Sequence, residues 1–247
     1  MNWDQIVQKV TPHIVKIETQ SGHGSGFLFM YNDNKSWCGI ATAAHVLYQA
    51  DKWKQPIQIF HSESNQTLFL QANERVITID WETDSAVLLF NKVELPLPEN
   101  LIPLLPSSSP LSIGLEVGWL GFPAIESFTL CFFSGIISAR QDFRKAYLID
   151  GVAIQGVSGG PVLYSTGTEG IQFIGTVNAY KANRVTGEAL PGLLIAQDVS
   201  HFHGVLQHVR SVDEANKKKQ EIEQSKLIND PNELTTASTR TDKTPSG

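Results

Sequence analysis

The sequence predicts an all-β protein built from two β units, with helices only near the ends of the chain. Across most of the sequence, short runs rich in Val, Ile, Leu and Phe alternate with Gly, Asn, Ser and Pro, as in strands joined by turns. Five prolines between residues 96 and 110 exclude a central strand or a continuous helix there. Apolar residues at helical spacing follow the last strand-like run.

The strand-like runs fall on both sides of the proline-rich stretch. They include, in chain order, HIVKIET, GSGFLFMY, PIQIFH, TLFLQA, SAVLLF, LEVGWLGF, GIISAR, AYLID, IQFIGTV and GLLIAQ. We therefore expect an N-terminal helix and a first β unit within residues 1–95, a linker over 96–110, and a second β unit over 111–197. No repeat of 20 to 50 residues is visible, so a solenoid or propeller is not supported.

The C-terminal region divides into an amphipathic part and a polar part. Val199, Phe202, Val205 and Val209 recur at helical spacing behind a capping Asp198 or Ser200, which predicts a docked helix over 198–211. Residues 212–247 are polar and predict a tail or linker, although their first half could extend the helix. This composition makes the tail a plausible binding region for a regulatory protein.

Composition and charge exclude several classes of function. With a net charge of −6 and one short basic cluster at residues 217–219, the chain is not expected to bind nucleic acid. The N-terminus lacks a leader pattern and no apolar run reaches membrane-spanning length, so we expect a cytoplasmic protein without a membrane span. Cys38 and Cys131 are too few for a disulfide framework and are interpreted as buried small side chains.

The segment GVSGGPV, residues 156–162, raises the main chemical question. Gly, Ser and Pro together are typical of an ordinary turn. A serine flanked by glycines is also typical of a nucleophile that must approach a substrate carbonyl closely, and Ser158 is the candidate. The segment alone does not decide between these interpretations.

A serine nucleophile needs a histidine as base, and His45 is the candidate. In GIATAAHV it follows a hydrophobic strand among small residues, where its imidazole could project into a cleft. The other histidines are interpreted as core or surface residues: His13, His23, His61, His201, His203 and His208. The pair in HFH lacks a nearby third ligand, so no metal site is predicted.

The base needs a carboxylate partner, for which the segment DWETDSAVLLF offers three candidates. Asp84 directly precedes a run that reads as a buried strand, so it is either a solvated strand-end charge or a partnered carboxylate. Asp80 and Glu82 are the competing candidates, but they lie in the polar segment that leads up to the buried run. We therefore prefer Asp84.

The three candidates occur along the chain in the order His, Asp, Ser, in the segments TAAHV, DSAVLL and GVSGGPV. Together with VTPHIVKIET, GHGSGFLF, GLEVGWLGFP and SGIISAR, they resemble the chymotrypsin-like serine peptidases, and most of all the HtrA-type bacterial branch and its cytosolic relatives. The resemblance covers residues 5–210. It implies two six-stranded antiparallel β-barrels followed by a C-terminal helix.

The resemblance also implies a catalytic triad in the cleft between the barrels. His45 would take the proton of the Ser158 hydroxyl, and Asp84 would fix the imidazole tautomer. The N–H groups of Gly156 and Ser158 would form the oxyanion hole. No cofactor or metal is implied.

Matching to the family also gives a substrate pocket. Its expected residues are Val152, Ala153, Ile154, Gln155, Asn178, Ala179, Tyr180 and Gly192. Val152 stands where trypsin-like relatives have an acid, so we expect an uncharged residue before the scissile bond, unless a loop shift brings in Asp150. The substrate strand is expected to add to the edge at residues 178–180.

The chain also departs from the family pattern. Val157 replaces the aspartate that relatives activated by proteolysis carry before the serine, which excludes activation through that salt bridge. Val46 replaces a disulfide cysteine of secreted relatives. The peptide-binding module that follows HtrA-type domains is not recognisable after residue 210.

We therefore expect a serine endopeptidase that acts on proteins or peptides through an acyl-enzyme. The alternative is a catalytically silent protease-fold module that binds extended peptides. A structural β-sandwich with chance motifs would require three ordered coincidences.

Overall fold

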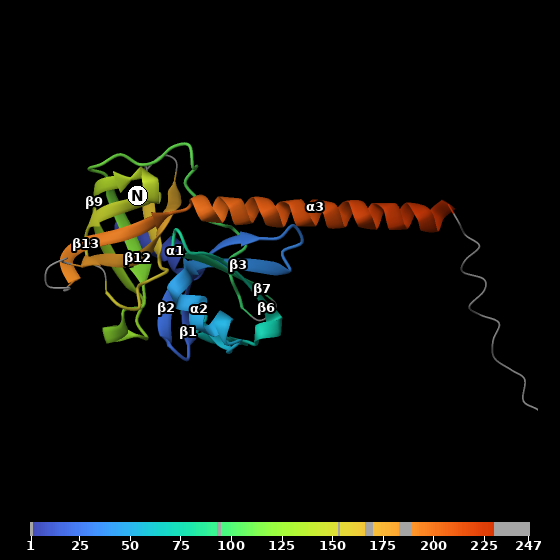
Figure 1. Ribbon diagram of the computed structural model, residues 1–247, viewed down its shortest axis with the longest axis horizontal. Coiled ribbons are helices and arrows are strands. Elements are labelled where there is room, and N and C mark those ends of the chain that lie inside the picture. The colour runs from blue at the N-terminus through green and yellow to red at the C-terminus, as the bar shows by residue number, and fades with distance from the viewer. Residues whose placement is uncertain (1, 93–94, 153, 166–169, 183–188, 230–247) are drawn as a thin grey trace, which may run out of the picture. The chain divides into compact units, whose positions relative to one another are not determined.

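The first β unit is a seven-stranded antiparallel sheet in the order β5-β4-β1-β2-β3-β7-β6. Figure 1 labels β1, β2, β3, β6 and β7 of this sheet. This computed structural model describes residues 2–92, 95–152, 154–165, 170–182 and 189–229, without the side chains of 179–182, 189–191 and 226–229. The strands are β1 Ile14–Thr19, β2 Gly22–Tyr31, β3 Trp37–Ala43, β4 Ile57–His61, β5 Gln66–Leu70, β6 Arg75–Asp80 and β7 Ser85–Asn91. Helix α1, Trp3–Val10, precedes the sheet, and α2, Ala44–Lys52, follows β3.

The second β unit is a closed barrel in the order β10-β13-β12-β11-β8-β9. Its strands are β8 Glu116–Gly121, β9 Cys131–Gln141, β10 Ala146–Asp150, β11 Pro161–Ser165, β12 Ile171–Ala182 and β13 Ala189–Asp198. The short 3-10 turns of the chain are Thr11–His13, Ala72–Glu74, Ala124–Glu126 and Asp142–Arg144. Both β units belong to one compact unit that ends at Gln207.

A closed six-stranded barrel beside a second antiparallel sheet confirms the predicted fold class. Two details differ: the first unit is a seven-stranded sheet, and helix α2 lies within it, although the sequence predicts helices only near the ends of the chain. The second barrel has the six strands expected, whereas the first unit has seven. The strand-like runs quoted from the sequence do not include β3 and β6 of this unit or β11 of the second. Strand β6 alternates weakly, with Val76 half exposed and Arg75 buried. The buried guanidinium of Arg75 is satisfied by the carbonyls of Leu70, Ala50 and Gln55.

Aromatic packing and hydrogen bonds join the two barrels. Phe27 of β2 and Phe173 of β12 are fully buried, with ring centroids 4.4 Å apart. Phe202 packs edge-on against Phe27 at 6.1 Å. The proline-rich segment between the barrels buries Leu97, Ile102 and Leu105. It also pairs with β12, since the Leu105 N–H donates to the Phe173 carbonyl at 2.8 Å. The seam is therefore a packed core in its own right.

Helix α3, Ser200–Asn229, is longer than the predicted 198–211. Its N-terminal turn begins behind Asp198, whose carboxylate accepts from the Ser200 N–H at 3.0 Å. From residue 205 to 229 the sequence contains no Gly or Pro and is rich in Glu, Lys and Gln, which all favour helix. The chain divides into its two units within this helix, after Gln207.

The two cysteines differ in their surroundings. Cys38 is fully buried, and burial raises the pKa of its thiol to about 12. Cys131 is only half-buried, at the start of β9, so the expectation of burial is wrong for this residue. Both are free thiols.

Candidate active site

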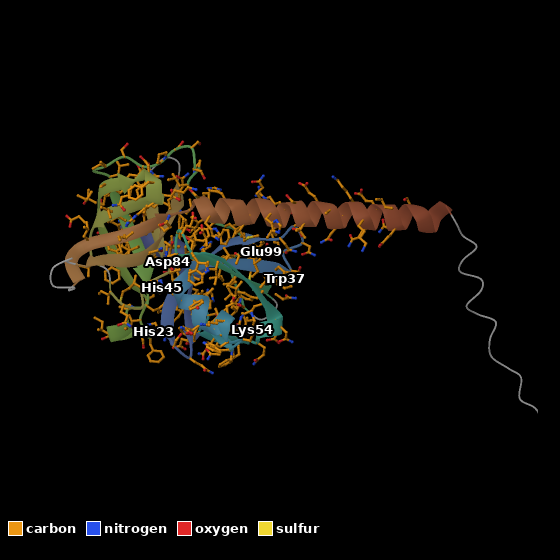
Figure 2. All side chains as sticks on the ribbon, viewed as in Figure 1. His23, Trp37, His45, Lys54, Asp84 and Glu99 are labelled. Carbon is orange, nitrogen blue, oxygen red and sulfur yellow. The ribbon has the colours of Figure 1, made fainter. Side chains whose placement is uncertain are left out.

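His45 is placed at the start of α2 by the packing of that helix. Ala44, Val46 and Leu47 are buried against the first sheet, which directs the intervening imidazole outward. The side chain of His45 is 47% exposed. The sequence Ala-His-Val-Leu thus buries three neighbours and leaves the histidine available to a partner. Figure 2 labels His45 and Asp84, which lie next to each other.

Asp84 lies at the end of the tight turn between β6 and β7, next to His45. Its backbone has φ 48°, in the left-handed region that Asp tolerates better than most residues. The Asp84 carbonyl accepts from the Ala44 N–H at 3.0 Å, which ties the turn to the start of α2. The same α2 terminus therefore positions both residues.

The Asp84 carboxylate fixes the imidazole tautomer. Its Oδ1 accepts from the His45 backbone N–H at 3.0 Å, and its Oδ2 lies 2.8 Å from His45 Nδ1. An ionised carboxylate only accepts, so Nδ1 carries the hydrogen. The Nε2 atom of a neutral His45 is then free to accept a proton.

Asp80, the competing acid, has a different role. Its carboxylate accepts from the Glu82 N–H at 3.0 Å and from the Thr83 hydroxyl at 2.8 Å, which closes the turn that presents Asp84. Although burial opposes ionisation, these hydrogen bonds and the nearby His201 hold the pKa of the Asp80 carboxyl below its usual value. Of the three acids, the structure brings Asp84 to His45.

Asn178 fastens the same turn from the second barrel. Its amide donates to the carbonyls of Thr83 at 2.9 Å and Asp84 at 3.2 Å. The side chain is buried, whereas matching to the family places Asn178 among the residues of the substrate pocket. Its backbone carbonyl lies 3.5 Å from the Ser158 Oγ.

The residues before Ser158 form a type II turn. Val157 N–H donates to the Ile154 carbonyl at 3.1 Å, and Gly156 at the third position has φ +92°. The Gln155 carbonyl accepts from the Ala124 N–H at 2.7 Å, so the Gly156 N–H on the same planar peptide points the opposite way. A Cβ at Gly156 would lie 2.4 Å from the Phe122 carbonyl oxygen, so only glycine fits.

Ser25 of β2 holds this loop from the first barrel. Its hydroxyl donates to the Gly156 carbonyl at 2.9 Å, and its N–H donates to the Ser158 carbonyl at 2.8 Å. Among the described residues, the N–H groups of Gly156 and Ser158 have no backbone acceptor. Val157 is fully buried, which accounts for a bulky side chain beside the serine.

Ser158 and His45 line one open cleft of about 220 Å³. Gly156 and Gln155 of the serine loop and His23 of β2 also line it. This arrangement places an alcohol, an imidazole with a free nitrogen and two unpaired N–H groups around one space. These are the groups needed for acyl transfer.

The matched substrate pocket is described in part. Ala153 lies outside the described residues, and Ala179 and Tyr180 are described only as backbone of β12. Val152 is exposed, and Gly192 has φ +89° and accepts from the Gly151 N–H at 3.0 Å. A carboxylate oxygen of Asp150 lies 3.8 Å from the Cβ position of Gly192, so the acid left open by the sequence lies near one of the matched residues.

Sequence reasoning missed Ser25 and His23, and it assigned Asn178 to the substrate pocket without its contacts to the turn of Asp84. His23 was interpreted as a core or surface residue but lines the cleft, and its position ahead of the Gly-Ser-Gly of β2 was the only available signal. The two histidines of the HFH segment have different partners: His201 lies beside Asp80, and His203 contacts the Leu105 carbonyl. Over the residues that the structure describes, there is no group of three metal-ligating side chains.

A closed six-stranded barrel and a second sheet, with a histidine, an aspartate and a serine at their seam, define a chymotrypsin-like serine peptidase. The family model for the trypsin-like peptidase domain matches residues 24–168, which include His45, Asp84 and Ser158. The chain therefore belongs to the trypsin-like peptidase family.

Solved structures show the same fold. The serine endoprotease from Yersinia pestis is similar with a TM-score of 0.61 and 22% identity, over 85% of this chain and 67% of that one. An inactive form of the Rv3671c protease of M. tuberculosis is similar with a TM-score of 0.56 and 18% identity, over 83% of this chain and 92% of that one. A search of curated proteins found no match. Within the described part of the chain, no helix is long and apolar enough to cross a membrane.

Proposed function

We propose that the protein is an active serine endopeptidase in which Ser158 is the nucleophile, His45 the general base and Asp84 the residue that orients it. The observation that carries this proposal is the pair of contacts from one Asp84 carboxylate to the His45 N–H and Nδ1. These contacts leave Nε2 as the proton acceptor in the cleft that Ser158 lines.

The proposed reaction follows from these positions. Ser158 Oγ attacks the scissile carbonyl carbon while its proton passes to His45 Nε2, and the same proton then goes to the departing amine. The N–H groups of Gly156 and Ser158 bind the oxyanion, each contributing about 3 to 4 kcal/mol to transition-state stabilisation. Water repeats the sequence to release the acyl group from Ser158.

A second candidate function is a silent peptide-binding module, and one observation favours it. The Ser158 hydroxyl donates to the Asn178 carbonyl at 3.5 Å, and no hydrogen bond to His45 is found among the described residues. Catalysis therefore requires the Ser158 hydroxyl to exchange this acceptor for His45 Nε2. An active enzyme is compatible with this arrangement, since catalytic hydrogen bonds are often long until substrate binds.

The residue preference before the scissile bond is also a proposal. Because Val152 stands at the matched pocket position, we expect an uncharged residue there, whereas the nearness of Asp150 to Gly192 favours Lys or Arg. A peptide library read by mass spectrometry decides between them. Dominant cleavage after Arg in the wild type, abolished in Asp150→Asn, would assign the pocket to Asp150.

A fluorophosphonate probe, which phosphonylates an activated serine, tests catalysis itself. We expect labelling of the wild type and none of Ser158→Ala. Turnover of an ester by Ser158→Ala or His45→Ala should fall by roughly 10⁴- to 10⁶-fold, and the double variant should be little worse, because the residues act as a unit. An unlabelled but folded wild-type protein would support the silent module instead.

A further inference from the structure

One wall of the cleft has no role in the proposed mechanism. It is formed by the β1–β2 hairpin, which contributes Thr19, Ser21 and His23. None of the described residues of β12 and β13 lines the cleft, so it lies on the side of Ser158 away from Asn178. Since His45 also lines it and must return the proton to the departing amine, the leaving part of a substrate lies in this cleft.

The hydroxyl groups of this wall have no hydrogen left to donate. Thr19 Oγ1 donates its only hydrogen to the Gly22 carbonyl at 3.1 Å, because a carbonyl cannot donate. Thr19 Oγ1 also lies 3.0 Å from Ser21 Oγ, so in this pair Ser21 is the donor. Both hydroxyl hydrogens are thereby used within the hairpin, and only oxygen lone pairs remain for the cleft.

The imidazole of His23 likewise keeps a hydrogen-bond acceptor and has no donor left. Its Nε2 lies 3.1 Å from the Phe122 carbonyl oxygen, which can only accept, so Nε2 carries the hydrogen. In a neutral imidazole Nδ1 is then an acceptor. Among the described residues, Nδ1 of His23 has no hydrogen-bond partner. This ring therefore adds a third acceptor to the wall.

The lining also lacks fixed charges. Lys, Arg, Asp and Glu are all absent from the described residues around the cleft, and its remaining polar side chain outside the triad is Gln155. At the hairpin wall a carboxylate would meet lone pairs without a counter-charge, because the N–H donors of the cleft, at Gly156, Ser158 and the Gln155 amide, lie on the serine loop opposite. An amide of the same shape would offer two N–H donors to these lone pairs.

Resting on the proposed function, we propose that this wall is a subsite for the residue after the scissile bond, which takes side chains with an amide N–H and rejects carboxylates. His23 is its specificity-determining residue. The recognition is by hydrogen-bond polarity rather than by size, so Gln and Glu, which have nearly the same shape, should be separated. We expect about a tenfold preference for Gln, since a site whose polar groups are left unpaired rejects an isostere strongly.

Aminolysis of the acyl-enzyme isolates this subsite from the rest of the substrate. p-Nitrophenyl acetate would acetylate Ser158, and glutaminamide, glutamic acid α-amide or leucinamide would compete with water for the acetyl group. The α-amino nitrogen attacks the ester carbonyl, the bond to Ser158 Oγ breaks, and the proton lost by nitrogen reaches Oγ through His45. The ratio of N-acetylated amide to acetate measures how well each side chain is held.

In the wild type, glutaminamide should form about tenfold more product than glutamic acid α-amide, with leucinamide in between. His23→Leu should reduce the preference to about twofold or less, and Ser21→Ala should reduce it partly. His208→Leu, the same substitution at an exposed position on α3, should leave it unchanged. Thermal unfolding and fluorophosphonate labelling of each variant show whether it is folded with its triad intact.

The outcomes separate the two proposals. A wild type that neither reacts with the fluorophosphonate nor hydrolyses the ester overturns the catalytic function and the subsite with it. Ester hydrolysis with equal use of glutaminamide and glutamic acid α-amide overturns the subsite alone. A tenfold preference that survives in both His23→Leu and Ser21→Ala shows that the hairpin wall is not its cause, and also overturns it.

Discussion

Replacing Asp84 by Asn tests the assignment of the acid without changing the shape of its side chain. One carboxylate oxygen of Asp84 accepts from the His45 N–H at 3.0 Å, and the other lies 2.8 Å from His45 Nδ1. In the amide, the oxygen can keep the first contact, and the NH₂ group then faces Nδ1 and can only donate to it. Nδ1 must give up its hydrogen, so Nε2 carries the proton and cannot accept one from Ser158.

We expect Asp84→Asn to lower the rate of serine acylation by roughly 10³- to 10⁴-fold, the cost of the wrong tautomer. This corresponds to about 4 to 5.5 kcal/mol of transition-state stabilisation. The assay is the second-order rate of fluorophosphonate labelling, measured together with release of p-nitrophenol from the acetate ester. Thermal unfolding of the same samples shows whether the variant is folded.

Asp80→Asn is the matched control, with the same change four residues earlier. Its remaining oxygen can still accept from the Thr83 hydroxyl, so the turn should persist and labelling should slow by less than about tenfold. The reasoning is refuted if Asp84→Asn reacts within tenfold of the wild type, or if Asp80→Asn is the damaging change.

Three further predictions concern Gly156, Asp80 and residues 212–247. Gly156→Ala should lower the rate of fluorophosphonate labelling by about 10²- to 10³-fold, because the Gly156 N–H would be displaced. A Cβ at this position would lie 2.4 Å from the Phe122 carbonyl oxygen, and φ +92° is strained for alanine. Unchanged labelling would contradict the oxyanion assignment. Since the pKa of folded Asp80 is lowered, its ionised form stabilises the fold above the ordinary carboxyl pKa, and this contribution is lost as the pH falls through the folded value. Urea midpoints should therefore drop more steeply for the wild type than for Asp80→Asn as the pH is lowered through and below the ordinary carboxyl pKa, and parallel curves would count against the carboxylate. Deleting residues 212–247 should change activity or association measured by light scattering, and an unchanged protein would argue against a regulatory tail.

The fold class and the three triad candidates could be predicted from the sequence because they lie on strong local signals. Ala44, Val46 and Leu47 mark the buried side of the element that carries His45, and Gly156 marks a backbone position that tolerates no side chain. Such signals are read from a few neighbouring residues.

The supporting contacts could not be predicted, because they join residues far apart in the chain. Nothing near Ser25 indicates that its hydroxyl reaches the Gly156 carbonyl 131 residues away. Likewise, the amide of Asn178 can donate to the Thr83 carbonyl only once both barrels are folded. His23 was set aside because a lone histidine on a strand has no local feature that indicates a cleft.

The hydrogen bonds across the seam have a consequence for how this protein could be divided. Ser25 of the first barrel holds the loop of the nucleophile, and Asn178 of the second barrel holds the turn of the acid. Each barrel therefore supplies the hydrogen bonds that hold the reactive segment of the other barrel in place. If the chain were severed within residues 96–110, neither fragment alone would present an ordered site, and hydrolysis would report their reassembly.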